Sequence, residues 1–381
     1  MQQLSPGSAF GVGYASGDLA ASAIGTVTYT DGDRVWGFGH PLDGVGARSL
    51  LLQDAYVFRI INNPVVIPGI SGTYKYAAAG HDIGTLTNDA LAAVVGRVGA
   101  LPPTVPVRVF ATDLDTGAKR SLVTNVADET AVDQPYGTSI LSLLAPLAVL
   151  QAGGTVLGGS PARLTGRGCF AVSFKELRRR ARFCNRYVTA ATDPLAGNAL
   201  AAAAGADLLQ ALSLIDAYQA TPLHVTGVEA NLQIQRGRQQ AYLRSVRLPR
   251  RGRAGRRVPA TLTLRHVGGR LERRKVRLRL PSDLRPGRRR VVLTGTDIDA
   301  DAGLTSELLE FEFDFGDTGG DLGAPNPRAL AAEIEGLARY DGVSARRPSH
   351  DPENFDPGEP SYRDPRLRIS GRAHASIRIT R

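Results

Sequence analysis

The fold of the N-terminal region is decided by one short stretch, GTVTYTDGDRVWGFGHP, residues 25–41. A β-branched, alternating run from Thr26 to Thr30 meets an Asp31-Gly32 turn, and a second apolar run follows from Val35 to Phe38. Two strand-like runs joined by an Asp-Gly pair predict a β-hairpin.

The hairpin ends in Gly39-His40-Pro41. Gly39 permits a close backbone approach or a positive φ, and Pro41 forces His40 out of the helical conformation. A histidine held in this way at the end of a strand is the best catalytic candidate in the chain. We predict that His40 is a general base.

The pattern of this hairpin resembles the histidine motif of the SpoIVB-type serine peptidases. The likeness extends from about Pro6 to Gly99 and includes the segment Gly80–Asp89, which is similar to a later strand of that family. The resemblance implies a chymotrypsin-like β-barrel, a protein or peptide substrate, and catalysis without a cofactor or metal. It also implies a secreted protein or one of the bacterial cell envelope.

The nucleophile loop of that family, a Gly-Met-Ser-Gly-Ser-Pro-like string, is absent from the chain. The nearest local substitutes contain Ser71 and Ser160, and Ser71 follows His40 too closely to leave room for a second barrel. Ser160, in Gly-Gly-Ser-Pro, is the nucleophile candidate, although Ser-Pro is also a common turn. In some relatives the loop precedes the histidine hairpin, which would place it before Met1.

Two carboxylates, Asp43 and Asp54, are possible partners of His40 by proximity in the sequence alone. His81 is followed by Asp82, but adjacent strand residues point to opposite faces, so this pair forms no dyad. We interpret His81 as a turn histidine.

The composition indicates a mainly β protein with a few helices. Hydrophobic residues make up 43% and charged residues 22% of the 381 residues, as in ordinary globular proteins, while 43 Gly and 23 Pro favour many turns and short strands. We find no run of 18 apolar residues and expect no transmembrane segment. The first residues lack the basic and apolar regions of a signal peptide, and the abrupt start fits either a missing upstream part or a gene model begun too late.

Turn signals and composition divide the chain into four units. We expect a peptidase-like β domain over residues 1–103 and an α+β region over 104–222, with apolar helices near Thr138–Ala152 and Pro194–Tyr218. Five strands over 223–295 predict a small immunoglobulin-like β-sandwich. Residues 296–381 are expected to hold an acidic linker, a short helix at Asn326–Tyr340 and a C-terminal strand region that completes the sandwich or stands alone.

The acidic linker opens with Asp297, Asp299 and Asp301, which resembles the start of a calcium loop. Ala302 and Leu308 occupy the positions where such a loop needs Gly and Glu, so we predict a linker rather than a metal site. The two cysteines, Cys169 and Cys184, fit either a disulfide or two reduced side chains. The resemblance to exported proteins favours the disulfide.

Positive charge is concentrated between Arg244 and Arg290, where 18 Arg or Lys accompany only Glu272 and Asp283, although the whole chain carries only +10. Such a face predicts a solvated surface that attracts an anionic partner, namely a wall polymer, a membrane surface, nucleic acid or the acidic segment that follows it in the chain. Tyr242, just before this range, is the one aromatic residue of the region, which argues against nucleic acid. Arginine outnumbers lysine 42 to 4 in the whole chain, so a general compositional bias also contributes.

Three functional hypotheses follow. The first is a SpoIVB-type serine endopeptidase domain, active, truncated or inactive. The second is a non-catalytic adhesion or binding module of the envelope, and the third is a nucleic-acid-binding protein.

Overall fold

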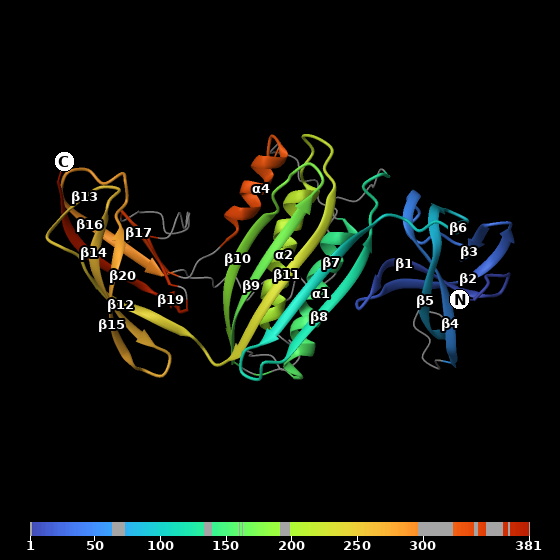
Figure 1. Cartoon of the computed structure of the whole chain (residues 1–381), viewed down its shortest axis with the longest axis horizontal. Coiled ribbons are helices and arrows are strands. Elements are labelled where there is room, and N and C mark those ends of the chain that lie inside the picture. Colours follow the sequence, from blue (N-terminus) through green and yellow to red (C-terminus); the bar gives the residue numbers. More distant parts are fainter. Residues whose placement is uncertain are drawn as a thin grey trace.

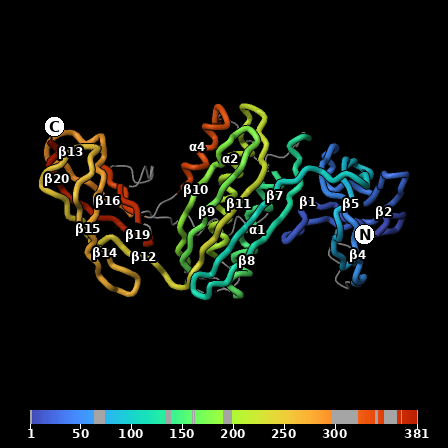
Figure 2. Tube along the Cα trace, viewed as in Figure 1, coloured from blue at the N-terminus to red at the C-terminus, as the bar shows by residue number. Residues whose placement is uncertain are grey.

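The computed structural model describes residues 2–62, 73–132, 139–159, 161, 163–190, 199–295, 323–338, 342–347, 361–364 and 366–380. Strands make up 57% and helices 15% of the described residues, which confirms the expected mainly β fold. Three units follow one another along the long axis, and the two termini lie at opposite ends (Figures 1 and 2).

The N-terminal unit is a closed six-stranded antiparallel barrel. Its strands hydrogen-bond in the order β1-β2-β3-β6-β5-β4, and β4 pairs with β1 to close the ring. Closure leaves no free edge within this ring. The interior is filled by apolar side chains that include Phe10, Val12, Leu50, Leu52 and Leu86. The strands are β1 (Ala9–Gly17), β2 (Ala21–Asp31), β3 (Arg34–Gly37), β4 (Gly46–Asn62), β5 (Thr73–Ala90) and β6 (Ala93–Val98).

The central unit is an open five-stranded sheet in the order β10-β9-β11-β7-β8. Its β11 and β7 are parallel, and the other neighbours are antiparallel. The end of β1 pairs with β8, which joins the barrel to this sheet. The described residues therefore form one barrel followed by an open sheet, not the two barrels of a chymotrypsin-like fold. The strands are β7 (Thr104–Asp113), β8 (Lys119–Ala127), β9 (Arg163–Phe174), β10 (Ala181–Ala190) and β11 (Val225–Arg236).

Helices α1 (Ile140–Leu157) and α2 (Ala199–Asp216) pack on one face of the central sheet (Figure 1). Gly205 of α2 lies so close to α1 that a Cβ there would stand 3.0 Å from the Pro146 carbonyl oxygen. Both helices are long and apolar enough to cross a membrane by length and composition, which is weak evidence because more than half of each is buried in this unit.

One strand expected in the sandwich belongs to the central sheet instead. The range 223–295 begins with β11, which pairs with β7 and β9 over most of its length. Its alternating burial indicates a strand, but alternation does not select the sheet that the strand joins.

The C-terminal unit is a β-sandwich of two sheets that share one apolar core. The sheets have the orders β15-β14-β12-β19 and β13-β20-β16-β17-β18. Strands β17, β18, β19 and β20 from the end of the chain complete both sheets, so these strands belong to the sandwich rather than to a separate domain. The strands are β12 (Gln240–Arg247), β13 (Arg251–Arg253), β14 (Arg257–His266), β15 (Leu271–Arg279), β16 (Gly287–Gly295), β17 (Gly342–Arg346), β18 (Tyr362–Arg363), β19 (Arg368–Ser370) and β20 (Arg372–Thr380).

The expected short helix is present as α4 (Pro327–Gly336), and Asn326 caps it by accepting the N–H groups of Arg328 and Ala329. This helix packs on β10 and α2, away from the sandwich strands that follow it (Figure 1). Helix α4 therefore packs on the central unit, although β16 before it and β17 after it belong to the sandwich.

Cys169 and Cys184 form a disulfide between directly paired residues of β9 and β10. A cross-link over 15 residues restricts the unfolded chain.

We predict that reduction with dithiothreitol lowers the free energy of unfolding by about 2–3 kcal/mol. Urea unfolding with and without reductant measures this. The Cys169→Ser/Cys184→Ser variant should not respond to reductant, and an unchanged midpoint for the native chain would contradict the prediction.

Candidate functional site

The His40 site is built on the predicted hairpin. Strands β2 and β3 pair from Val27↔Gly37 to Asp31↔Arg34, so the two loop residues are Gly32 and Asp33, one position later than expected. Gly32 has a φ of 57°, which suits the first loop position of a tight hairpin.

The backbone after β3 turns through two left-handed residues before it reaches His40. Phe38 has a φ of 67° and Gly39 a φ of 77°. Positive φ is costly for a side chain as large as Phe, so neighbouring contacts must stabilise Phe38 there. The Phe38 N–H donates to the Thr26 carbonyl oxygen at 3.1 Å. These two residues redirect the chain away from the sheet.

The Phe38 ring is seated against the barrel where glycines leave room for it. Its centroid lies 5.3 Å from that of Phe10. A Cβ on Gly25 would stand 1.9 Å from the Phe38 ring, and one on Gly37 would stand 2.2 Å from the Phe10 ring. Gly25 and Gly37 are therefore required by the two aromatic rings, which fix the position of the corner.

The His40 imidazole is exposed and lies on the Phe38 ring, with 5.3 Å between centroids. Its Nδ1 is 2.6 Å from the Pro41 carbonyl oxygen. Because a carbonyl only accepts, Nδ1 must carry the proton in this contact. Nε2 of the neutral ring is then the basic nitrogen, which is the form that a general base needs.

Asp89 fixes the loop that follows His40. This carboxylate is fully buried and accepts three backbone N–H groups, from Leu42 at 2.7 Å, Asp43 at 2.7 Å and Gly44 at 2.8 Å. Three converging donors satisfy the buried charge. Sequence patterns did not single out Asp89, because its loop partners lie more than 40 positions away.

Neither acidic partner considered for His40 contacts its ring. Asp43 accepts from Arg48 Nη1 at 2.8 Å, while Arg48 also donates Nε to the buried Glu129 at 2.9 Å. Burial and then the Asp43 carboxylate raise the pKa of the nearby Tyr14 phenol. Asp43 therefore belongs to an ion-pair network beside the corner.

Asp54 pairs with His81 instead. The buried Asp54 carboxylate accepts the His81 backbone N–H at 2.6 Å and lies 3.2 Å from His81 Nδ1. A Cβ on Gly80 would lie 2.2 Å from Asp54 Oδ1, so only glycine fits beside it. His81 is thus a strand residue of β5 with an oriented ring, not the turn histidine that we expected. The shift in register between β4 and β5, which sequence alone does not show, brings the pair together.

The predicted nucleophiles Ser160 and Ser71 lie outside the described residues, as does the acidic segment 296–322. Within the described part of the chain, no serine hydroxyl hydrogen-bonds the His40 ring. Ser16 and Ser22 donate to Asp82 at 2.7 Å and to Gln53 at 2.6 Å, respectively. The proposed roles of His40 and Ser160 remain predictions.

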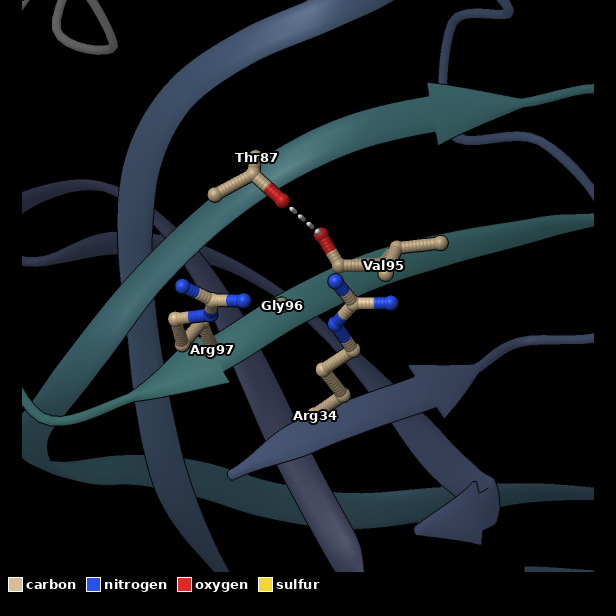
Figure 3. Close-up of a pocket in the computed structure, with 5 residues that line it drawn as sticks. All are labelled: Arg34, Thr87, Val95, Gly96 and Arg97. Atoms are coloured by element: carbon tan, nitrogen blue, oxygen red, sulfur yellow. Dashed lines mark hydrogen bonds between the residues drawn. The ribbon is translucent and has the colours of Figure 1, made fainter. Parts of the chain in front are cut away.

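A small pocket lies elsewhere on the barrel wall, lined by Arg34, Thr87, Val95, Gly96 and Arg97 (Figure 3). Its volume of 210 Å³ is below the range typical of small-molecule sites. His40 and its supporting residues do not line it, so we assign it no role in the site.

We predict that Asp89→Ala lowers the free energy of unfolding by about 3 kcal/mol, because three N–H groups lose a charged acceptor. Urea unfolding measures the change. Asp31→Ala, an exposed position at the hairpin turn, is the control and should change the free energy by less than about 0.5 kcal/mol. Equal midpoints for the two variants would rule out the proposed support of the loop.

The Asp54–His81 pair predicts a pH-dependent contribution to stability. Burial alone would raise the pKa of Asp54, but the N–H groups of Gln2 and His81 and the His81 ring hold it below its usual value. The contribution is therefore present above the unfolded-state pKa of about 3.9 and is lost as the pH falls through the lower folded-state pKa. The native chain should be more stable than Asp54→Asn at pH 6, and the difference should vanish in acid. A pH-independent difference in urea unfolding would refute this.

In comparisons with known proteins, no family model matches the chain, and neither the curated proteins nor the solved structures contain a significant match.

Proposed function

We propose that the N-terminal barrel supplies the general-base half of a SpoIVB-type serine peptidase site. The observation that carries this proposal is the His40 ring, which is exposed on a fixed corner with Nδ1 directed at the Pro41 carbonyl oxygen. That contact leaves Nε2 as the base.

In the proposed reaction His40 takes the proton from a serine hydroxyl as that oxygen attacks a peptide carbonyl. It then returns the proton to the leaving amine. The Pro41 carbonyl would perform the orienting role that a carboxylate has in the usual triad. The substrate would be a protein or peptide, and the reaction needs neither a metal nor an organic cofactor.

The cell envelope or the extracellular space is the proposed location. The Cys169–Cys184 disulfide supports it, because disulfides persist in oxidising compartments and are rare in the cytosol.

A non-catalytic binding module of the envelope is the second candidate. It is favoured by the lack of a serine at the His40 ring within the described residues and by the open sheet that follows the barrel. The barrel would then have the His40 corner of a peptidase but no serine nucleophile beside it.

Labelling with a fluorophosphonate probe tests the first proposal against the second. If the peptidase proposal holds, the folded chain is labelled, His40→Ala abolishes labelling, and His81→Ala retains it as a matched exposed histidine on the same barrel. Mapping of the adduct then identifies the nucleophile and tests Ser160 directly. Absence of labelling in folded protein, or equal loss in both variants, would reject the role of His40 in this chain.

A further inference from the structure

One outer face of the sandwich carries only positive charge among its exposed ionisable residues. It is formed by the outward side chains of β12, β14 and β15, and the inward ones enter the sandwich core. The exposed cations of this basic face are Arg244, Arg247, Arg257, Arg265, Arg273, Lys275, Arg277 and Arg279, and Arg279 Nε also donates to the Gly255 carbonyl oxygen at 3.4 Å.

Glu272 is the one carboxylate on the three strands of the basic face. Glu272 of β15 accepts from Arg274 Nε and lies against His266, at 2.7 Å in each case, and so is paired beside the face. Arg274 also contacts Asp364. Within the described part of the chain, no ion pair with a carboxylate is formed by Arg244, Arg247, Arg257, Arg265, Arg273, Lys275 or Arg277.

The cations of β12 and β15 form two rows with a track of short polar side chains on β14 between them, while Arg257 and Arg265 lie on β14 itself, at the ends of the track. Thr261 of β14 pairs with Arg247 of β12 on one side and with Lys275 of β15 on the other. Thr263 lies in the same way between Ser245 and Arg273. The central strand thus offers hydroxyl groups, and longer cationic side chains border it.

The spacing along β15 is regular. Arg273, Lys275 and Arg277 occupy alternate positions on one face, so their Cα atoms repeat about every 6.8 Å. This repeat is comparable with the distance between successive phosphates of an extended phosphodiester chain. The arginine bias of the whole chain explains why most cations are arginines. The strands of the opposite sheet also lack carboxylates, so the basic face is distinguished by the regular cation spacing on β15 beside Thr261 and Thr263.

We propose that the basic face binds a linear phosphodiester polymer that lacks nucleobases. Phosphates would contact the cation rows and the polymer would follow the threonine track. A flat lipid surface would contact the long cationic side chains of β12 and β15 but not the shorter Thr261 and Thr263 side chains between them. Tyr242, 37% exposed, is the one aromatic side chain on the face and lies at its end, so the face offers no row of rings on which bases could stack.

Binding of the full chain to poly(glycerol phosphate) tests the proposal. Replacing Arg273, Lys275 and Arg277 together by Gln should weaken binding roughly a hundredfold and reduce the slope of log affinity against log salt by about 2. The matched control replaces Arg288, Arg290 and Arg378, which are exposed on the opposite sheet, by Gln. It removes the same charge and should change the affinity less than about fivefold. Thermal unfolding verifies that both variants fold.

Three results would overturn the proposal. The first is no binding of poly(glycerol phosphate) at physiological salt. The second is equal loss in both variants, which would indicate an effect of net charge without a specific face. The third is tighter binding of oligo(dT) or of phosphatidylglycerol vesicles, which would identify nucleic acid or membrane as the partner. None of these measurements depends on peptidase activity.

Discussion

The pairing of β1 is the constraint on which the N-terminal half depends. Its first residues bond β2 on one side and β4 on the other, from Phe10↔Asp54 to Gly13↔Leu51, which closes the barrel. Its last residues pair with β8 and so begin the central sheet. Gly13 makes the closure possible, because a Cβ there would lie 2.6 Å from the Gln53 amide. The buried Gln53 side chain in turn bonds Ser22 and Asp82 across the barrel.

The pairing of β4 with β5 supports the His40 corner. It places the start of β4 opposite the end of β5, with Gly46 paired to Asp89, so the Asp89 carboxylate reaches the loop after His40. The end of β3 lies beside β6, where Gly37 pairs with Val94. The corner is thus stabilised by the packing of Phe38 on Phe10 and by the buried Asp89 carboxylate, which binds the loop after His40. A hairpin by itself would supply neither support.

Strand β15 of the sandwich contributes both to the apolar core and to the basic face. Alternation along β15 sends Val276 and Leu278 into the core and Arg273, Lys275 and Arg277 to the surface. Apolar burial stabilises the unit, while the outward positions are free to carry charge. The concentration of like charge costs stability through repulsion, which is a reason to expect an anionic partner for this face.

Local features of this protein were determined by the sequence alone. The hairpin before His40, the Asn326 cap of α4 and the two-faced pattern of β15 all follow from turn chemistry, capping and side-chain period, which act over a few residues. The tertiary structure decided which strands are neighbours. It assigned β11 to the central sheet, brought β17–β20 back to the sandwich, and joined Asp54 to His81 and Asp89 to the His40 loop. The physical reason is that the period of a strand fixes which side chains are buried, whereas pairing and register depend on chain closure between distant segments.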